Sequence, residues 1–132
     1  MGGVLCDEVA KITMGDACDF TNFMTAVIDQ RAFDKISDYI ERAKASDTCE
    51  VVVGGGSDDS KGWFIEPTII VTSDAKAESM VEEIFGPVLT VYVYEDDDFD
   101  DVLELCDESS PYALTGAIFA THEADIQKAF NA

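Results

Sequence analysis

The residues of this chain that are best suited to act as nucleophiles, general bases or metal ligands are its four cysteines and its single histidine. Each cysteine is followed directly by an acidic residue, which disfavours the reactive thiolate, and no two have the spacing of a CxxC motif. The histidine follows Thr121, a residue suited to cap a helix, so we expect it on the surface in a first helical turn. We therefore predict free thiols and no catalytic or metal-binding residue. The five side chains are Cys6, Cys18, Cys49, Cys106 and His122.

Two other segments could bind a phosphate or a cation, but both depart from the pattern that such binding requires. The glycines at 54–56 lack the GxGxxG spacing of a dinucleotide site and precede no helical pattern, so a turn is predicted. The acidic run 95–101 begins like a calcium loop. However, Asp101 stands where that loop needs glycine, and Asp107 stands where it needs a bidentate glutamate. Because the run overlaps a helical pattern, we predict acidic residues at a helix N-terminus.

The segment Glu82–Val88, with the sequence EEIFGPV, combines two carboxylates, an aromatic ring and a Gly-Pro pair. It has the pattern of a helix end, a sharp turn and a strand start. This arrangement would place Glu83 and Phe85 at the carboxyl end of a helix, near the mouth of an α/β sheet.

Apolar spacing predicts the elements that would position this segment. An amphipathic helix is predicted over 31–45 and a buried strand over 50–53, followed by a polar loop over 57–62. An extended stretch over 63–71 is expected to be an edge strand or to break at Pro67, which cannot donate a ladder hydrogen bond. The remaining predictions are a short helix at 75–83, a strand at 88–94 buried on both faces, a helix at 98–108, a strand at 114–119, and a final helix capped by Thr121.

Alternation of strands with helices of about ten residues predicts an α/β fold, with a mostly parallel sheet and flanking helices. A length of 132 residues fits a single domain.

Composition excludes several classes of function. The chain has 28 acidic against 8 basic residues and a net charge of −20, which would repel nucleic acid and anionic membrane surfaces. No apolar run approaches the roughly 18 residues of a membrane span, and no basic segment resembling a signal peptide precedes the acidic start. We expect a soluble chain that binds neither nucleic acid nor a membrane.

Three segments resemble the aldehyde dehydrogenase superfamily. EEIFGPV at 82–88 matches a signature of that family, and Gly62–Thr68 resembles its G-[YWF]-F-[IV]-x-P-T segment. Tyr112–Phe119 resembles its Y-G-L-x-x-[AG]-[VI]-F segment, with Ala113 where glycine is usual. Order and spacing agree from about residue 12 onward. Within the superfamily, the chain is most similar to the Δ1-pyrroline-5-carboxylate dehydrogenases, which oxidise glutamate γ-semialdehyde to glutamate in proline catabolism.

The resemblance implies a role in binding NAD. In the family, the second glutamate of the signature hydrogen-bonds the nicotinamide ribose and the phenylalanine contacts the nicotinamide, so Glu83 and Phe85 are the expected cofactor-binding residues. Gly86 and Pro87 are expected to shape the turn. Lys35 lies where some members approach the adenosine end of the cofactor, although a solvated helix face is the simpler interpretation.

The family's catalytic cysteine, oxyanion-stabilising amide and water-activating glutamate lie upstream of the matched region, as does its cofactor-binding domain. Its substrate-anchoring glycine-rich loop lies downstream. The resemblance therefore implies that residues 1–132 form one partial catalytic domain, inactive alone and exposing apolar surface. The parent would be a homo-oligomer acting on a small aldehyde, mitochondrial in eukaryotes and cytoplasmic in bacteria. The alternative is a small acidic, non-catalytic binding module that pairs with a full-length dehydrogenase.

Overall fold

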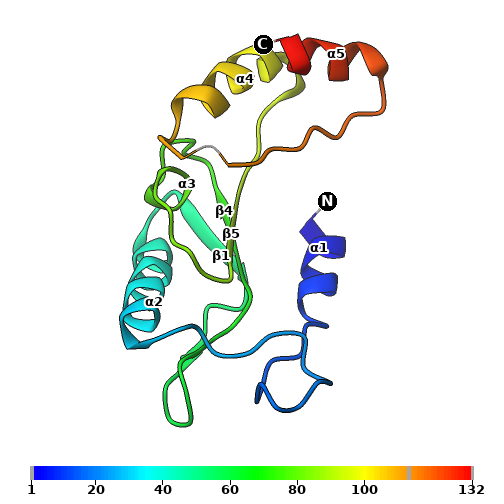
Figure 1. Ribbon diagram of the computed structural model, residues 1–132. Coiled ribbons are helices and arrows are strands. Elements are labelled where there is room, and N and C mark those ends of the chain that lie inside the picture. The colour runs from blue at the N-terminus through cyan, green and yellow to red at the C-terminus, as the bar shows by residue number, and fades with distance from the viewer. Residues whose placement is uncertain (1, 113, 132) are drawn as a thin grey trace.

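A computed structural model of the chain describes residues 2–112 and 114–131. Helices and strands alternate through the middle of the chain, with helices at both ends (Figure 1). The helices are α1 (Gly2–Val9), α2 (Gln30–Ala45), α3 (Glu78–Val81), α4 (Phe99–Glu108) and α5 (Glu123–Asn131), with a 3₁₀ turn, η1 (Asp96–Asp98), before α4. The strands are β1 (Cys49–Val53), β2 (Ser57–Asp58), β3 (Phe64–Ile65), β4 (Thr68–Thr72) and β5 (Val88–Tyr92).

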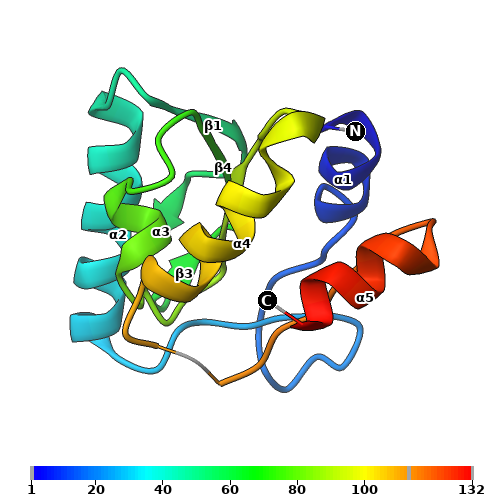
Figure 2. The same cartoon turned by 90° about the horizontal axis from the view of Figure 1, so that it is seen from above.

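A three-stranded sheet in the order β1-β4-β5 lies at the centre of the molecule. β4 pairs antiparallel with β1 and parallel with β5, and β2 and β3 form a separate antiparallel pair. Helices α2 and α1 flank the sheet on opposite sides, while α4 and α5 lie beyond one end of it (Figures 1 and 2). The predicted α/β fold with flanking helices is confirmed, but in the described residues the pairing is mixed and not mostly parallel.

Helix α2 forms because its ends are capped and one face is apolar. The Asp29 carboxylate accepts a hydrogen bond from the Ala32 amide at 2.8 Å, and the Ser46 amide donates to the Ala43 carbonyl. Ile36 and Ile40 on its inner face are 0% and 1% exposed. They form a core cluster with Ile65 before β4 and Ile84 before β5. This helix therefore holds the start of two strands against one apolar surface.

The extended stretch 63–71 breaks at Pro67 into β3 and β4, which is the second of the two predicted alternatives; the first is wrong for β4, which is the central strand of its sheet. The chain resumes hydrogen bonding at Thr68, whose amide donates to the Pro87 carbonyl at 2.8 Å. The Thr68 hydroxyl donates to the Glu66 carbonyl and accepts from the buried Gly55 amide. Gly54 has a φ of 69°, and a Cβ there would lie 2.2 Å from the Pro67 carbonyl oxygen. Only glycine therefore fits where the chain passes the Pro67 backbone.

Three strand predictions differ from the structure. β1 is an edge strand with alternating exposure, not a buried strand, and it bulges near Val52. β5 is also at a sheet edge and only half-buried, with Leu89 49% exposed. The predicted strand at 114–119 is absent from the described residues, where that stretch is irregular and Leu114 and Phe119 are almost fully exposed. A strand needs a partner for its ladder, and none of the described segments pairs with this stretch or with the outer edge of β5.

Several smaller predictions can be compared as well. The helices at 31–45 and 98–108 are confirmed, and the helix at 75–83 is shortened to α3. The acidic run enters η1 and α4, as the helix interpretation required. The last helix begins at Glu123, and the His122 carbonyl, not Thr121, receives its first backbone hydrogen bonds. α1 and the short strand β2 were not predicted.

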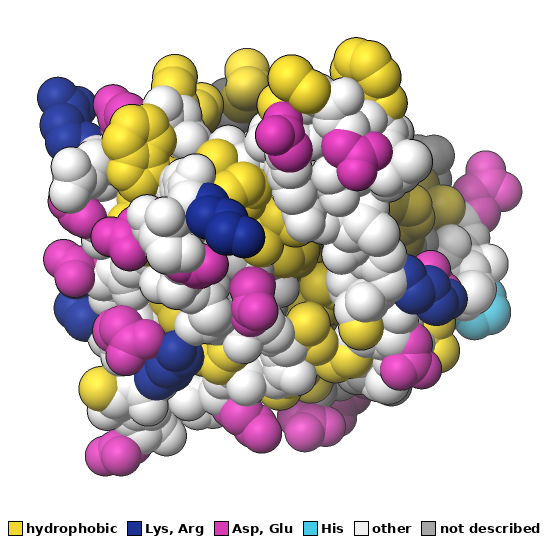
Figure 3. Space-filling model, turned by 90° about the horizontal axis from the view of Figure 1, so that it is seen from below, with side chains coloured by type: hydrophobic (Ala, Val, Ile, Leu, Met, Phe, Trp, Pro, Cys, Tyr) yellow, Lys and Arg dark blue, Asp and Glu magenta, His cyan; other side chains and the backbone are white. Residues whose placement is uncertain are grey.

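The surface is acidic and also unusually apolar. Seen from below, acidic side chains are scattered over this face, with hydrophobic side chains exposed between them and along its upper edge (Figure 3). The expectation of exposed apolar surface is confirmed, and such surface normally marks a contact with another polypeptide. None of the helices in the described part of the chain has the length and apolar character that a bilayer crossing requires. The most exposed large apolar side chains are Phe20, Phe23, Ile28, Phe85, Leu114, Phe119 and Phe130.

Replacing Thr68 by valine should lower the free energy of unfolding by about 1–3 kcal/mol, because the buried Gly55 amide would lose its acceptor. Thr90 in β5 is the matched control, since its buried hydroxyl has no hydrogen-bond partner among the described residues. Thr90→Val should be neutral or slightly stabilising. Urea unfolding of both variants checks this, and equal effects would contradict the role assigned to the Thr68 hydroxyl.

Candidate functional site

The segment between α3 and β5 forms the turn that the sequence predicts. α3 ends at Val81, β5 begins at Val88, and the chain between them runs alongside α2 (Figure 1). Glu83 and Phe85 are both exposed, whereas Ile84 between them is 8% exposed and belongs to the core cluster. The turn therefore presents a carboxylate and an aromatic ring to solvent on either side of one buried anchor.

Close packing against α2 shapes this turn. A Cβ at Gly86 would lie 2.5 Å from Cδ1 and 2.8 Å from Cγ1 of Ile36, which is fully buried. No side chain fits there unless Ile36 moves, so glycine is required for its size and not for its conformational freedom. Ile84 packs in the same cluster on the other side of Phe85. The expectation that Gly86 shapes the turn agrees with this packing.

Phe85 is held in an unfavourable conformation. Its φ is 60°, and it is the one non-glycine residue with positive φ in the described chain. The left-handed region costs a residue with a Cβ about 1–2 kcal/mol. The ring does not recover this cost by burial, because Phe85 is 85% exposed. Strain of this kind, with no gain in packing, is a feature of ligand-contacting residues.

The backbone of the turn is tethered to α2 by Lys35. Its Nζ donates a hydrogen bond of 2.6 Å to the Glu83 carbonyl. The Glu83 carboxylate itself forms no ion pair with any residue that the structure describes, so its oxygens remain available as acceptors. The sequence suggested Lys35 only as a contact near the adenosine end of a cofactor, whereas the structure places it against the backbone of Glu83.

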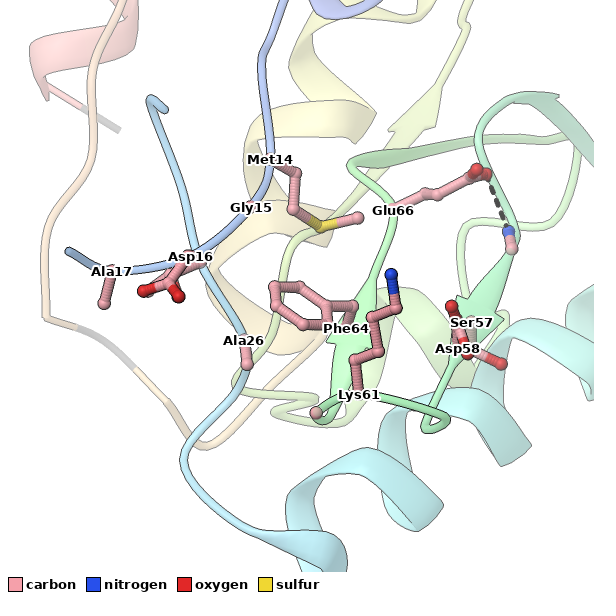
Figure 4. Close-up of a pocket in the computed structure, with 13 residues that line it drawn as sticks. Met14, Gly15, Asp16, Ala17, Ala26, Ser57, Asp58, Lys61, Phe64 and Glu66 are labelled. Carbon is pink, nitrogen blue, oxygen red and sulfur yellow. Dashed lines mark hydrogen bonds between the residues drawn. The ribbon is translucent and has the colours of Figure 1, made fainter. Parts of the chain in front are cut away.

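A second candidate site is a cavity of about 710 Å³ between the segment 14–26 and the β2–β3 pair (Figure 4). Met14 and Phe64 supply apolar walls, and the carboxylate of Glu66 turns to accept from the Gly56 amide at 3.0 Å. Hydrogen bonds from the Ser60 hydroxyl and then its amide hold the pKa of Asp58 below its ordinary value. Neither Glu83 nor Phe85 lines this cavity. Because the exposed turn carries the predicted chemistry, we regard it as the candidate site.

Sequence reasoning missed the residues that support the turn. Tyr39 and Arg42 stand one and two helical turns beyond Lys35 on α2, at a spacing that places all three on one face. The guanidinium of Arg42 lies 4.5 Å from the centre of the Tyr39 ring and pairs with Glu78 at 2.8 Å. The Glu78 hydrogen bond raises the pKa of Arg42. The i, i+4 spacing of Lys35 and Tyr39 was visible in the sequence, but their partners on α3 and the turn were not.

Phe85→Gly should change the free energy of unfolding by less than about 1 kcal/mol in either direction. Relief of the left-handed strain offsets the greater freedom of glycine in the unfolded chain, and an exposed ring contributes little burial. Urea denaturation measures the change. A loss of several kcal/mol, typical of a core phenylalanine, would show that Phe85 serves packing.

Unlike Phe85→Gly, Gly86→Ala should clearly lower the free energy of unfolding, by about 1–3 kcal/mol, because the added methyl overlaps Ile36. The same denaturation series measures it. If alanine were tolerated at Gly86 without loss, the close packing of the turn on α2 would be refuted.

Comparison with known proteins agrees with these observations. The sequence profile of the aldehyde dehydrogenase family matches residues 4–132. The mitochondrial Δ1-pyrroline-5-carboxylate dehydrogenase of Dictyostelium discoideum is 55% identical over 125 residues, covering 95% of this chain and 22% of the relative.

Solved structures show the same relationship. The Δ-pyrroline-5-carboxylate dehydrogenase of Mycobacterium tuberculosis is 44% identical and superposes with a TM-score of 0.91, covering 99% of this chain and 24% of that one. The same enzyme bound with NAD gives a TM-score of 0.88 at 41% identity, with coverage of 99% and 23%. The chain thus spans less than a quarter of the length of these relatives. With the signature turn formed as predicted and the profile matched from residue 4 onward, this chain belongs to the aldehyde dehydrogenase family.

Proposed function

We propose that this chain is a segment of an NAD-dependent Δ1-pyrroline-5-carboxylate dehydrogenase, which oxidises glutamate γ-semialdehyde to glutamate in proline catabolism. Its role there is to supply one corner of the cofactor site, with Glu83 and Phe85 as the binding residues. Support comes from relatives that bear this enzyme's name and from an NAD-bound relative with the same fold.

The observation that carries the proposal is the conformation of Phe85. Its aromatic ring is 85% exposed at a φ of 60° and so buries little area against the described part of the chain, while the residues on both sides of it are fixed by packing. A fold that maintains this strain gains from it when the ring contacts a ligand.

The side chains on the turn suit the nicotinamide half of NAD. The Glu83 carboxylate offers acceptors to two vicinal ribose hydroxyls, and the Phe85 ring offers an apolar surface that orients the nicotinamide. The chemistry that bound NAD would supply is that of a hydride acceptor. The carboxylate and the ring bind and orient, and they transfer no proton in this scheme.

What we propose for the whole protein rests on its relatives, because this chain covers only part of their length. The nucleophilic cysteine and the residues that activate water would lie in the parts of the enzyme outside this segment, so 1–132 would not turn over by itself. The relatives from Dictyostelium discoideum and Danio rerio are named as mitochondrial, which suggests the matrix for a eukaryotic parent. We further propose that the parent is a homo-oligomer. The alternative of an independent acidic binding module gains no support from these comparisons.

A chimera tests the role of the turn. Residues 4–132 would replace the matching quarter of the Mycobacterium tuberculosis enzyme, whose fold they share. In a folded, active chimera, Glu83→Ala should raise the KM for NAD by about ten- to a hundredfold, since a hydrogen bond to a charged group contributes about 1.5–3 kcal/mol. Steady-state kinetics at saturating aldehyde measure this change.

Glu82 provides the matched control, because it is the neighbouring carboxylate and is also exposed. Glu82→Ala should leave the KM for NAD within about twofold of the parent chimera, in line with the small effects of surface substitutions. Equal effects of the two substitutions would show that only net charge matters and would refute the assignment of Glu83.

The purified chain of 132 residues should show no NAD reduction with glutamate γ-semialdehyde, because the proposed nucleophile lies elsewhere in the enzyme. Absorbance at the NADH maximum measures turnover. Activity that persisted after repeated purification and was lost in Glu83→Ala would contradict this division of labour.

A further inference from the structure

Two polar contacts and the apolar packing of Ile36 join α2 to the segment 78–86. Arg42 pairs with Glu78 at the start of α3, and Lys35 donates to the Glu83 carbonyl after α3 ends. Directly after the second tether, Ile84 packs beside Ile36 in the core. One rigid helix thus holds the start of α3 and the two residues that precede Phe85.

Lys35 is itself held in place. Its Nζ lies 5.7 Å from the centre of the Tyr39 ring, and the guanidinium of Arg42 lies 4.5 Å from the same ring. The two cations therefore share one aromatic platform on the same face of the helix. This arrangement limits the freedom of the lysine side chain, so the hydrogen bond to Glu83 costs less entropy than a free surface lysine would lose.

The carbonyl that Lys35 holds is well placed to control the site. It belongs to the residue whose carboxylate is proposed to bind the ribose, and it lies two residues before the strained Phe85. The amides of Thr68 and Val88 are bonded to Pro87 and Gly86, which fixes the far side of the turn. On the near side, the Lys35 hydrogen bond and the buried Ile84 restrain Glu83–Phe85 directly, and the Ser110 hydroxyl holds the Val81 carbonyl two residues before Glu83.

We infer that Lys35 is a positioning residue that fixes the backbone of Glu83, so that the Glu83 carboxylate and the Phe85 ring are presented together in one orientation. Lys35 acts through the Glu83 carbonyl and need not touch the cofactor. This inference rests on the proposed cofactor role of the turn for its functional meaning, but the tether itself is a property of the chain.

Lys35→Met tests the tether, because methionine keeps an unbranched apolar side chain and removes the donor. In the wild-type chain, backbone order parameters from ¹⁵N relaxation at Glu83, Ile84 and Phe85 should be near the rigid value of about 0.85, and Lys35→Met should lower those of Glu83 and Phe85 to about 0.6 or less. Lys35→Arg should restore the wild-type values, since it keeps a cationic donor at that position.

Lys44 supplies the control. It lies on the same helix and also donates to a turn carbonyl, that of Gly55, at 2.7 Å. Lys44→Met should loosen residues 54–56 and leave 83–85 unchanged. Unchanged order parameters at Glu83 and Phe85 in Lys35→Met, or equal loosening there in Lys44→Met, would overturn the inference.

Saturation transfer from the chain to NAD separates this inference from the proposed function. We expect transfer to the nicotinamide protons that is lost in Lys35→Met and retained in Lys35→Arg and Lys44→Met, while unfolding midpoints of the two methionine variants stay similar.

Retention of the wild-type signal in Lys35→Met would overturn the positioning role. Retention in a Glu83→Ala, Phe85→Ala double variant would instead refute the proposed function. If the wild-type chain gives no transfer signal, the order parameters alone decide whether Lys35 holds the turn.

Discussion

The contact between Ile36 on α2 and the segment Ile84–Gly86 fixes the turn that leads into β5. Ile36 is fully buried, packs with Ile84, and leaves no room for a side chain at Gly86. Interiors are close-packed, so this fit allows few arrangements of the chain between them. With both neighbours fixed, Phe85 has to bridge them, and it does so in the left-handed region with its ring outside. The register of β5 against β4 then follows from where the turn ends.

In this segment, the residues that stabilise the fold differ from those that are exposed, as the exposure and the backbone strain of Phe85 show. The core residues beneath the turn provide stability, while Glu83 and Phe85 provide none that the structure reveals. Such a division is typical of binding sites, where residues suited to a ligand are retained although they weaken the fold. The Lys35 hydrogen bond lies between the two groups, because it orders the site without adding to the core.

Exposed apolar surface agrees with a segment that packs against more polypeptide. β5 has one unpaired edge within the described chain, and the stretch 114–119 carries exposed apolar side chains without forming a strand. Both segments were predicted to be strands from their composition, and the prediction held only for β5. The difference is physical, since β5 has β4 to pair with and 114–119 has no strand partner among the described residues. The prediction that β5 is buried on both faces is also wrong, because β5 lies at the edge of the sheet and no described strand pairs with its outer side.

Local sequence patterns predicted several of the helices and strands correctly. The apolar spacing of 31–45 and the break at Pro67 act over a few residues, so they could be recognised without coordinates. The family motif points to Glu83 and Phe85 as the proposed cofactor contacts. How these two side chains are presented depends on the tertiary structure. The Lys35–Glu83 hydrogen bond joins residues 48 apart, and the overlap of Gly86 with Ile36 spans a similar separation. Contacts at such distances along the chain depend on how α2 packs against the sheet, and no local pattern encodes that packing.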